Sequence, residues 1–330
     1  MYFLLFIIAF VFIVRHFSGL EKDFLLLERV KPWWLFAAML SQFTTYLAAA
    51  LIYRLLLPMR YRKGFHQFGT LVRAAVVALF FNQTVPSASL SGGVFIYRFL
   101  RQWRLPPARI LLTILSELFV YYLAVEILLL GLLLSGVTFF SLKHIFLILL
   151  SLGLLVYPVL GILLLTVSQK NLLPSLYAKL SHLRFLQRKI KSQMDDPGST
   201  NQLGMHTSVF RYLHAHKTTS ANAILLQLLV LLADGMTIYA LFHGLGIQVS
   251  FYTVMLVMSC TQVVSLLPFL PGSLLLYESS MSWFFASLLV PPGSAIVVTM
   301  LYRLLSFWMP MPFGLLFYRQ WLRNKKAVTT

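Results

Sequence analysis

The chain has 330 residues, of which 59% are hydrophobic and 11% are charged, and its mean hydropathy is +0.82. Soluble domains carry about 25% charged residues, so a deficit that extends over the whole length excludes a soluble protein and predicts a polytopic membrane protein. The formal net charge of +18 is interpreted as basic cytoplasmic loops that face anionic lipid headgroups, rather than as a nucleic-acid-binding surface.

Six apolar stretches are predicted to be membrane spans, because a spanning helix needs about 20 predominantly apolar residues. The first is short and lacks the basic segment and the cleavage site of a signal peptide, so it is interpreted as a span rather than as a cleaved leader. In chain order, the six stretches lie near 1–14, 33–57, 109–135, 144–168, 220–243 and 294–317.

Two further apolar regions are interrupted by Pro, Gly and Ser: the first broken region, 69–100, and the second broken region, 250–290. Each is either a pair of spans or a hairpin that enters and leaves the membrane on the same side. We predict an all-α polytopic integral membrane protein with about six full transmembrane helices and two Pro/Gly-broken re-entrant hairpins. If each limb of a broken region crosses fully, the number of spans rises to as many as ten.

The distribution of Lys and Arg predicts the orientation of the chain. Loops 54–73, 98–109, 169–217 and 318–326 carry 5, 4, 8 and 4 of these residues, whereas the second broken region carries none. The positive-inside rule therefore predicts that these four loops and both termini are cytoplasmic. The first broken region then opens to the cytoplasm and the second to the outside, as in the inverted repeats of many transporters.

The longest polar stretch, 169–219, is predicted to be a basic cytoplasmic linker between an N-terminal membrane half, 1–168, and a C-terminal membrane half, 220–330. It is too short for a catalytic domain. The linker contains His206, His214 and His216, but no carboxylate or thiol accompanies them at the spacing of metal ligands, so no metal site is predicted.

The two broken regions, each taken together with the helix that follows it, share an order of residues. A proline is followed by Arg98, a double proline and Glu117 in the first, and by Glu278, a double proline and Arg303 in the second. The double proline lies 20 residues after Pro86 in the first region and 20 after a proline of the second. Because the charges are exchanged in sign, Arg98 can pair with Glu278, and Glu117 with Arg303, across a pseudo-two-fold axis.

The segment "NQTVPSASLSGGVFIYR" at 82–98 breaks the first region. Broken backbone at membrane depth is tolerated only inside protein or beside a water-filled cavity. We predict a polar cavity here, in which free amides at a helix end and Arg98 meet an anionic group. The alternative, that Ser and Gly only permit close helix packing, does not explain the adjacent Pro86 and Arg98.

Ionised side chains within spans are costly, at least ~2.5–3.5 kcal/mol near the bilayer centre, so their presence indicates either a function or an internal salt bridge. A function is favoured for Glu117, Glu278 and Arg303. For Glu126 and Asp234 both alternatives stay open, because neither belongs to the repeated order.

These motifs resemble the lysylphosphatidylglycerol synthase transmembrane-region family, whose members are often called flippase-like domain proteins. The resemblance lies in 82–119 and 266–314, and Leu275 stands where the family usually has glycine. The positions that match the family pattern are Asn82, Pro86, Gly92, Gly93, Arg98, Glu117, Pro271, Gly272, Glu278, Arg303, Pro310 and Gly314.

The resemblance implies translocation of a membrane phospholipid, or of another lipid-linked substrate, through a central polar cavity of a bacterial or archaeal cytoplasmic (inner) membrane. Of the matching residues, all but Pro310 and Gly314 are expected to line that cavity, with the two arginines attracting phosphate. No nucleotide-binding motif is present, so ATP is not expected to drive the process. No cofactor, metal or catalytic residue is predicted. The chain ends just after the last span, so no synthase domain is expected.

Two other functions stay open. A lipid-modifying transferase would use the buried carboxylates Glu117 and Glu278 as general base and acid. A scaffold would instead recruit a separate lipid-modifying enzyme through the basic loops. Turnover of a defined donor by the purified protein would support the transferase, whereas cavity variants that keep function while deletions in 169–217 lose it would support the scaffold.

Overall fold

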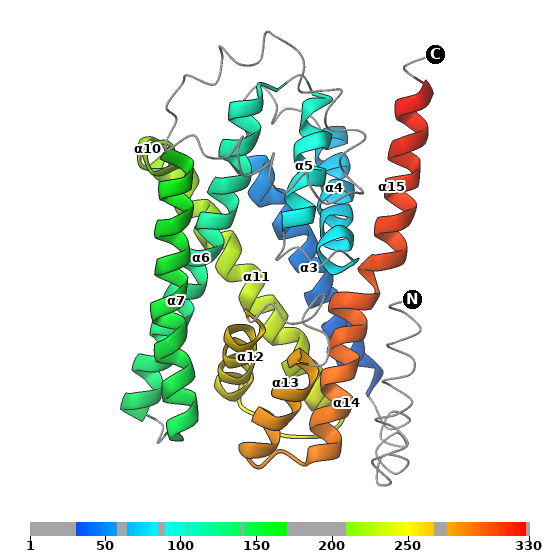
Figure 1. Cartoon of the computed structure of the whole chain (residues 1–330). Helices are drawn as coiled ribbons and strands as arrows, with labels where there is room; N and C mark the ends of the chain where they lie inside the picture. The colour runs from blue at the N-terminus through cyan, green and yellow to red at the C-terminus, as the bar shows by residue number, and fades with distance from the viewer. Residues whose placement is uncertain are drawn as a thin grey trace.

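The computed structural model describes residues 31–57, 65–84, 90–103, 105–139, 142–169, 209–266 and 276–327, which form helices and no strand (Figure 1). Five segments are long and apolar enough to cross a membrane, and they coincide with five of the six predicted spans; the sixth, near 1–14, lies outside the described residues. They are α3 (Pro32–Leu56), α6 (Pro107–Phe139), α7 (His144–Gln169), α11 (Lys217–Gly244) and the run formed by α14 (Pro292–Arg303), η5 (Leu304–Trp308) and α15 (Pro310–Ala327).

Shorter helices form the two broken regions. The first contains α4 (Phe65–Thr84) and α5 (Leu90–Arg101), and the second contains α12 (Phe251–Ser265) and α13 (Leu276–Ser287). With 12 residues each, α5 and α13 are about 18 Å long, less than the roughly 30 Å of a hydrocarbon core. Figure 1 shows the two pairs toward opposite ends of the bundle.

The helix ends that border the Lys- and Arg-rich loops gather at one end of the bundle, the upper end in Figure 1, which we call the basic end. There α3, α5, α7 and α15 finish, and α4, α6 and α11 begin. The short helix α10 (Val209–Ala215) lies at the same end, where the Tyr212 hydroxyl donates to the Leu56 carbonyl at 2.9 Å. We call the other end the opposite end.

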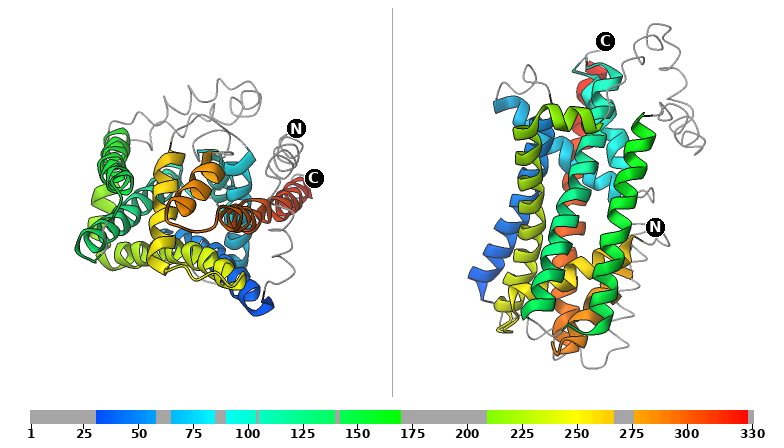
Figure 2. Two further views of the ribbon diagram at one scale, coloured as in Figure 1. Left: turned by 90° about the horizontal axis from the view of Figure 1, so that it is seen from below. Right: turned by 90° about the vertical axis from the view of Figure 1, so that its left-hand side faces the viewer.

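Helices α3 and α11 run antiparallel, side by side over most of their length (Figure 2). At the opposite end the Lys31 amide donates to the Gly244 carbonyl at 3.1 Å, and farther along the Ser41 hydroxyl donates to the Ala233 carbonyl at 2.9 Å. Small residues such as Ala38, which is fully buried, let the two backbones approach closely, as is usual where membrane helices pack.

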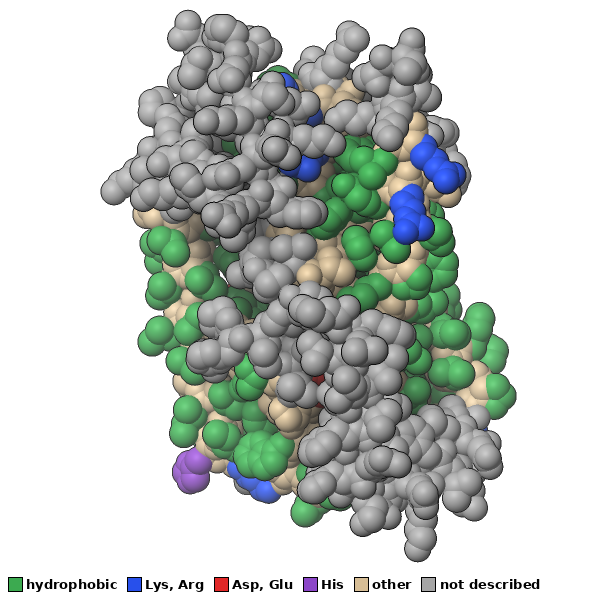
Figure 3. Space-filling view, turned by 45° about the vertical axis from the view of Figure 1, so that its right-hand side comes forward, with side chains coloured by type: hydrophobic (Ala, Val, Ile, Leu, Met, Phe, Trp, Pro, Cys, Tyr) green, Lys and Arg blue, Asp and Glu red, His purple; other side chains and the backbone are tan. Residues whose placement is uncertain are grey.

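The buried apolar side chains form a large cluster among α6, α7, α11, α12, α13 and α14, and a second one among α3, α4, α5, α6 and α15. The outward sides of the long helices are apolar as well: Leu134, Ile148, Leu155 and Leu225 are all more than half exposed. Figure 3 shows hydrophobic side chains over much of the described surface of one face. An apolar exterior of this extent matches a lipid environment.

Candidate functional site

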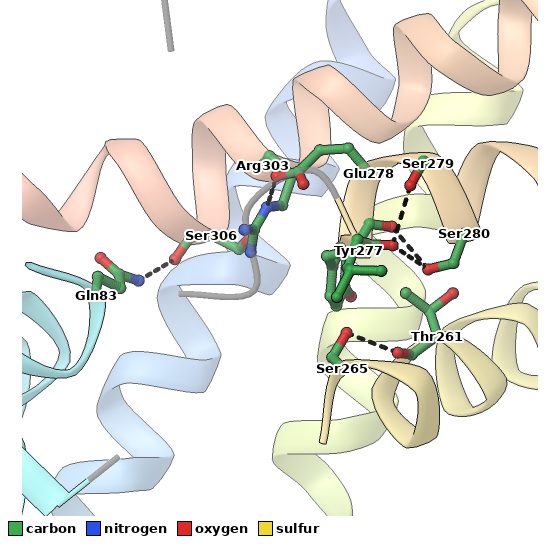
Figure 4. A network of polar contacts seen from close by, with 10 residues as sticks. Gln83, Thr261, Ser265, Tyr277, Glu278, Ser279, Ser280, Arg303 and Ser306 are labelled. Atoms are coloured by element: carbon green, nitrogen blue, oxygen red, sulfur yellow. Dashed lines mark hydrogen bonds and ion pairs between the residues drawn. The ribbon is translucent and has the colours of Figure 1, made fainter. Parts of the chain in front are cut away.

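A buried ion pair joins α13 to α14. The Nε of Arg303, the last residue of α14, lies 2.6 Å from the Oε1 of Glu278 in the first turn of α13 (Figure 4). Both side chains are more than nine-tenths buried. The guanidinium carbon also lies 4.6 Å from the ring centre of Tyr277 and 4.4 Å from that of Phe307. The arginine is therefore held by one carboxylate and two aromatic rings.

This ion pair corrects the pairing that the sequence suggested. The exchanged signs allowed Arg98 to pair with Glu278, and Glu117 with Arg303. Instead, Glu278 and Arg303 pair with each other within one half of the chain, because α13 and α14 are neighbouring helices of the second half. The pairing across a pseudo-two-fold axis is wrong.

The ion pair leaves one carboxylate oxygen of Glu278 without a described hydrogen-bond donor. Glu278 Oε2 is buried and accepts no hydrogen bond from any residue that the structure describes. A buried polar atom without a partner costs free energy, and in a native structure it is often explained by a ligand, a water or a functional role. The carboxylate thus retains capacity for a hydrogen-bond donor or a cationic group.

A π-helix, η5, follows Arg303 directly. Its cause is in the sequence: Pro310 has no N–H, so the carbonyl of Ser306, four residues earlier, has no donor in an α-helical ladder. The Met309 amide, whose α-helical partner would be the Leu305 carbonyl, bonds to the Leu304 carbonyl, five residues back, at 2.8 Å. Single π-helical turns occur frequently at functional sites.

Side chains from other helices bond the carbonyls that the π-helix leaves available. Gln83, in the last turn of α4, donates through Nε2 to the Ser306 carbonyl at 3.2 Å (Figure 4). The Tyr46 hydroxyl of α3 donates to the Leu305 carbonyl at 2.8 Å. The inner end of the first broken region therefore reaches the helix that carries Arg303.

Within the first broken region, Asn82 bonds the start of the next helix. Its Oδ1 accepts from the Gly92 amide at 2.7 Å and from the Ser91 hydroxyl at 3.3 Å, so it caps α5 across the break. A Cβ at Gly92 would lie 2.6 Å from the Ala78 carbonyl oxygen and 2.7 Å from the Asn82 amide. Only glycine allows this approach without displacement of the α4 backbone.

The other predicted site residues are not all brought together. Arg98 lies partly buried on α5 and forms no ion pair with a described carboxylate, and Gly93 packs near Ile114 of α6. Glu117 of α6 accepts a long hydrogen bond, 3.4 Å, from the Tyr53 hydroxyl of α3. Pro86, Pro271 and Gly272 lie outside the described residues.

The sequence motifs did not indicate four residues around the site: Gln83, Tyr46, Tyr277 and Phe307. Pro310 was the available signal, because a proline within an apolar span predicts a carbonyl that needs a donor from elsewhere. Nothing in the sequence indicates which side chains supply those donors. Among the described residues, no three His, Cys, Asp or Glu side chains form a group that could hold a metal ion.

Comparisons with known proteins agree with the sequence motifs. The profile of the lysylphosphatidylglycerol synthase TM region matches residues 2–314. A UPF0104 membrane protein of Pyrococcus horikoshii is 30% identical over 121 residues, which cover 37% of this chain and 35% of that protein. One of Methanothermobacter thermautotrophicus is 29% identical over 104 residues, or 32% and 31% of the two chains. The matches thus span about a third of the curated relatives.

Proposed function

Because the chain belongs to the lysylphosphatidylglycerol synthase transmembrane-region family, we propose that this multi-pass membrane protein moves the headgroup of an amphipathic lipid between leaflets without ATP. The observation that carries the proposal is the buried Glu278–Arg303 pair, whose carboxylate has an oxygen without a described donor. Two opposite charges inside a membrane protein are costly to retain for packing alone.

The chemistry of the pair fits a phospholipid headgroup. A phosphate takes the place of Glu278 on the Arg303 guanidinium, since arginine binds phosphate through charge-assisted hydrogen bonds. The released carboxylate then faces any ammonium group of the headgroup. The acyl chains stay in the bilayer, in contact with the apolar exterior of the long helices. Arg98, Glu117, Asn82 and Gly92 remain the predicted lining of the path on the side of the first broken region.

The short helices of the two broken regions would form the path that the lipid headgroup takes through the protein. Neither α5 nor α13 is long enough to cross a hydrocarbon core alone, and the two pairs lie toward opposite ends of the bundle. We take the helix pair α4–α5 as a re-entrant hairpin that enters from the basic end, and the helix pair α12–α13 as one that enters from the opposite end. The positive-inside rule then gives a cytoplasmic basic end in a bacterial or archaeal inner membrane.

The decisive experiment is leaflet exchange in proteoliposomes that contain the purified chain and fluorescent lipids with anionic, zwitterionic, cationic and sugar headgroups. The test variant is the double replacement Glu278→Leu with Arg303→Met, which removes both charges and leaves neither one buried alone. We expect the wild type to accelerate exchange of one headgroup class and the double variant to lose that activity while staying folded. The matched control, Arg323→Gln, changes an exposed charge on α15 and is expected to exchange normally.

Equal exchange by the wild type and the folded double variant would refute the role of the pair. If no headgroup exchanges faster than in protein-free liposomes, translocation itself is refuted. Turnover of a lipid donor by the purified protein would then support the function of a lipid-modifying transferase. Loss of function on deletion of the basic linker would support the function of a scaffold for a separate lipid-modifying enzyme.

A further inference from the structure

A second polar site lies between α3 and α11, outside the repeated motifs. Gln42 of α3 donates through Nε2 to Asp234 Oδ1 at 3.3 Å and to Thr45 Oγ1 at 3.1 Å. Gln42 is 3% exposed, and no Lys or Arg of the described residues lies within ion-pairing distance of Asp234. A carboxylate within a membrane span thus has a neutral amide as its partner, where a salt bridge would be the usual structural solution.

The side-chain amide of Gln42 can form hydrogen bonds in a second orientation. Its Oε1 is buried and accepts no hydrogen bond from a described residue. A turn of the amide by half a revolution puts Oε1 where Nε2 now lies, within reach of Asp234 and Thr45. A charged Asp234 accepts from Nε2, and a neutral Asp234 donates its O–H to Oε1. The site therefore offers Asp234 a hydrogen-bond partner in both protonation states.

Four tyrosines on the surrounding helices lie near Asp234. It interacts electrostatically with Tyr46 of α3, Tyr121 of α6, Tyr277 of α13 and Tyr302 of α14. None of these carries a positive charge. Addition of a proton therefore removes a partly buried charge that no cation among its described neighbours balances.

The same face of α3 connects this site to the ion pair. Gln42, Thr45 and Tyr46 lie within one turn of α3, and the Tyr46 hydroxyl bonds the Leu305 carbonyl in the π-helix next to Arg303. Tyr277 contributes too, because its ring lies against the Arg303 guanidinium and stacks on Tyr302, with ring centres 6.3 Å apart. A change in the charge of Asp234 can therefore affect Arg303 through Tyr46 and the π-helix, or through Tyr277.

The two sites also lie at similar distances along their helices. Asp234, Glu278 and Arg303 are each about 15 Å along their helices from the opposite end, at a rise of 1.5 Å per residue. We propose that Asp234 is a proton-binding site that couples lipid movement to the proton gradient, with Gln42 as the residue that senses its charge. This inference rests on the proposed function and adds the ion that drives it.

The first arm of the test does not depend on transport. Dicyclohexylcarbodiimide modifies protonated carboxyl groups in apolar surroundings, and peptide mass spectrometry locates the product in the purified full chain. We expect modification at Asp234 that falls as the pH rises and is the same in sodium and in potassium salts. Absence of modification at every pH would overturn the proposal. Protection by sodium would also overturn it, since the site would then hold a metal cation instead of a proton.

The second arm measures the steady-state distribution of the transported lipid in proteoliposomes with an imposed pH gradient. With one proton per lipid, the wild type is expected to shift the leaflet ratio by up to about tenfold per pH unit. Asp234→Asn, which keeps the shape and the hydrogen bonding, is expected to exchange lipid with no response to the gradient. Glu126→Gln replaces a carboxyl of α6 that forms no hydrogen bond with Gln42 among the described residues, and is expected to respond like the wild type.

The outcomes separate the two proposals. Lipid exchange by the wild type that ignores the gradient overturns the coupling and leaves translocation standing. If the wild type exchanges no lipid at all, translocation fails, and the proton-binding site is still judged by the carbodiimide result.

Discussion

The two broken regions carry the same order of prolines and charges, yet different interactions hold them. In the first, the Gly92 amide donates a hydrogen bond to Asn82 Oδ1, and this bond and the close approach at Gly92 join α4 to α5, while no described carboxylate forms an ion pair with Arg98. In the second, the ion pair of Glu278 and Arg303 joins α13 to α14. An ion pair is therefore part of the structure around Glu278, whereas none of the described residues forms one with Arg98.

The largest difference is expected from breaking the ion pair. Glu278→Gln leaves the Arg303 charge buried without its partner, so the free energy of unfolding in detergent should fall by about 3–5 kcal/mol. Glu278→Leu with Arg303→Met should cost much less, since no charge is left buried. A single variant as stable as the double one would show that the pair does not hold α13 to α14.

Next in size is a methyl group added at Gly92. Its Cβ would meet the backbone oxygen of Ala78, so Gly92→Ala should lower the free energy of unfolding by about 1–3 kcal/mol. Gly93→Ala is the matched control: there the nearest atom, of Ile114, is at an ordinary 3.4 Å, and alanine favours the helix. Equal stability of the two variants would contradict the close approach at Gly92.

The contact between the two regions is expected to be weaker. Gln83→Leu removes the donor to the Ser306 carbonyl and should cost about 1 kcal/mol, the usual net value of one hydrogen bond. Gln320→Leu, on the exposed surface of α15, serves as the comparison in the same unfolding measurement. If both substitutions have the same effect, the π-helix does not depend on α4.

Arg98→Gln should change stability least, by less than about 0.5 kcal/mol, because no described carboxylate pairs with this arginine. It should nevertheless slow leaflet exchange of an anionic lipid if Arg98 attracts the phosphate. Unfolding and exchange are measured on the same preparation. A loss of stability with normal exchange would reverse the assignment and make Arg98 a structural residue.

The long helices were predictable from the sequence because the length of an apolar stretch alone determines them. Helices α3, α7 and α11 begin and end within a few residues of the predicted spans 33–57, 144–168 and 220–243. The π-helix was not predicted, although Pro310 was visible in the sequence. A missing donor shows that a carbonyl needs compensation, but the form of the compensation depends on helices far away in the chain.

The partner of each charge was not predictable either. The sequence order of Arg98, Glu117, Glu278 and Arg303 is symmetric, and a symmetric order permits pairing across the halves as well as within one. Packing of α13 on α14 decides between them, and the aromatic rings of Tyr277 and Phe307 fix the guanidinium there. Asp234 was left open for the same reason, since its importance depends on Gln42, 192 residues earlier.

The similar position of Asp234, Glu278 and Arg303 along their helices has an electrical consequence. If the opposite end lies at the surface of a hydrocarbon core of roughly 30 Å and the helices cross it upright, about 15 Å is half of its thickness, so a charge that moves between this level and either surface would cross about half of the membrane voltage. That is worth about 1 kcal/mol for each elementary charge at 100 mV. The arrival of an anionic headgroup at Arg303 would generate a current, and so would the arrival of a proton at Asp234. The two currents have opposite signs when both species enter from the same surface. Transport of one anionic lipid together with one proton would therefore move no net charge across the membrane.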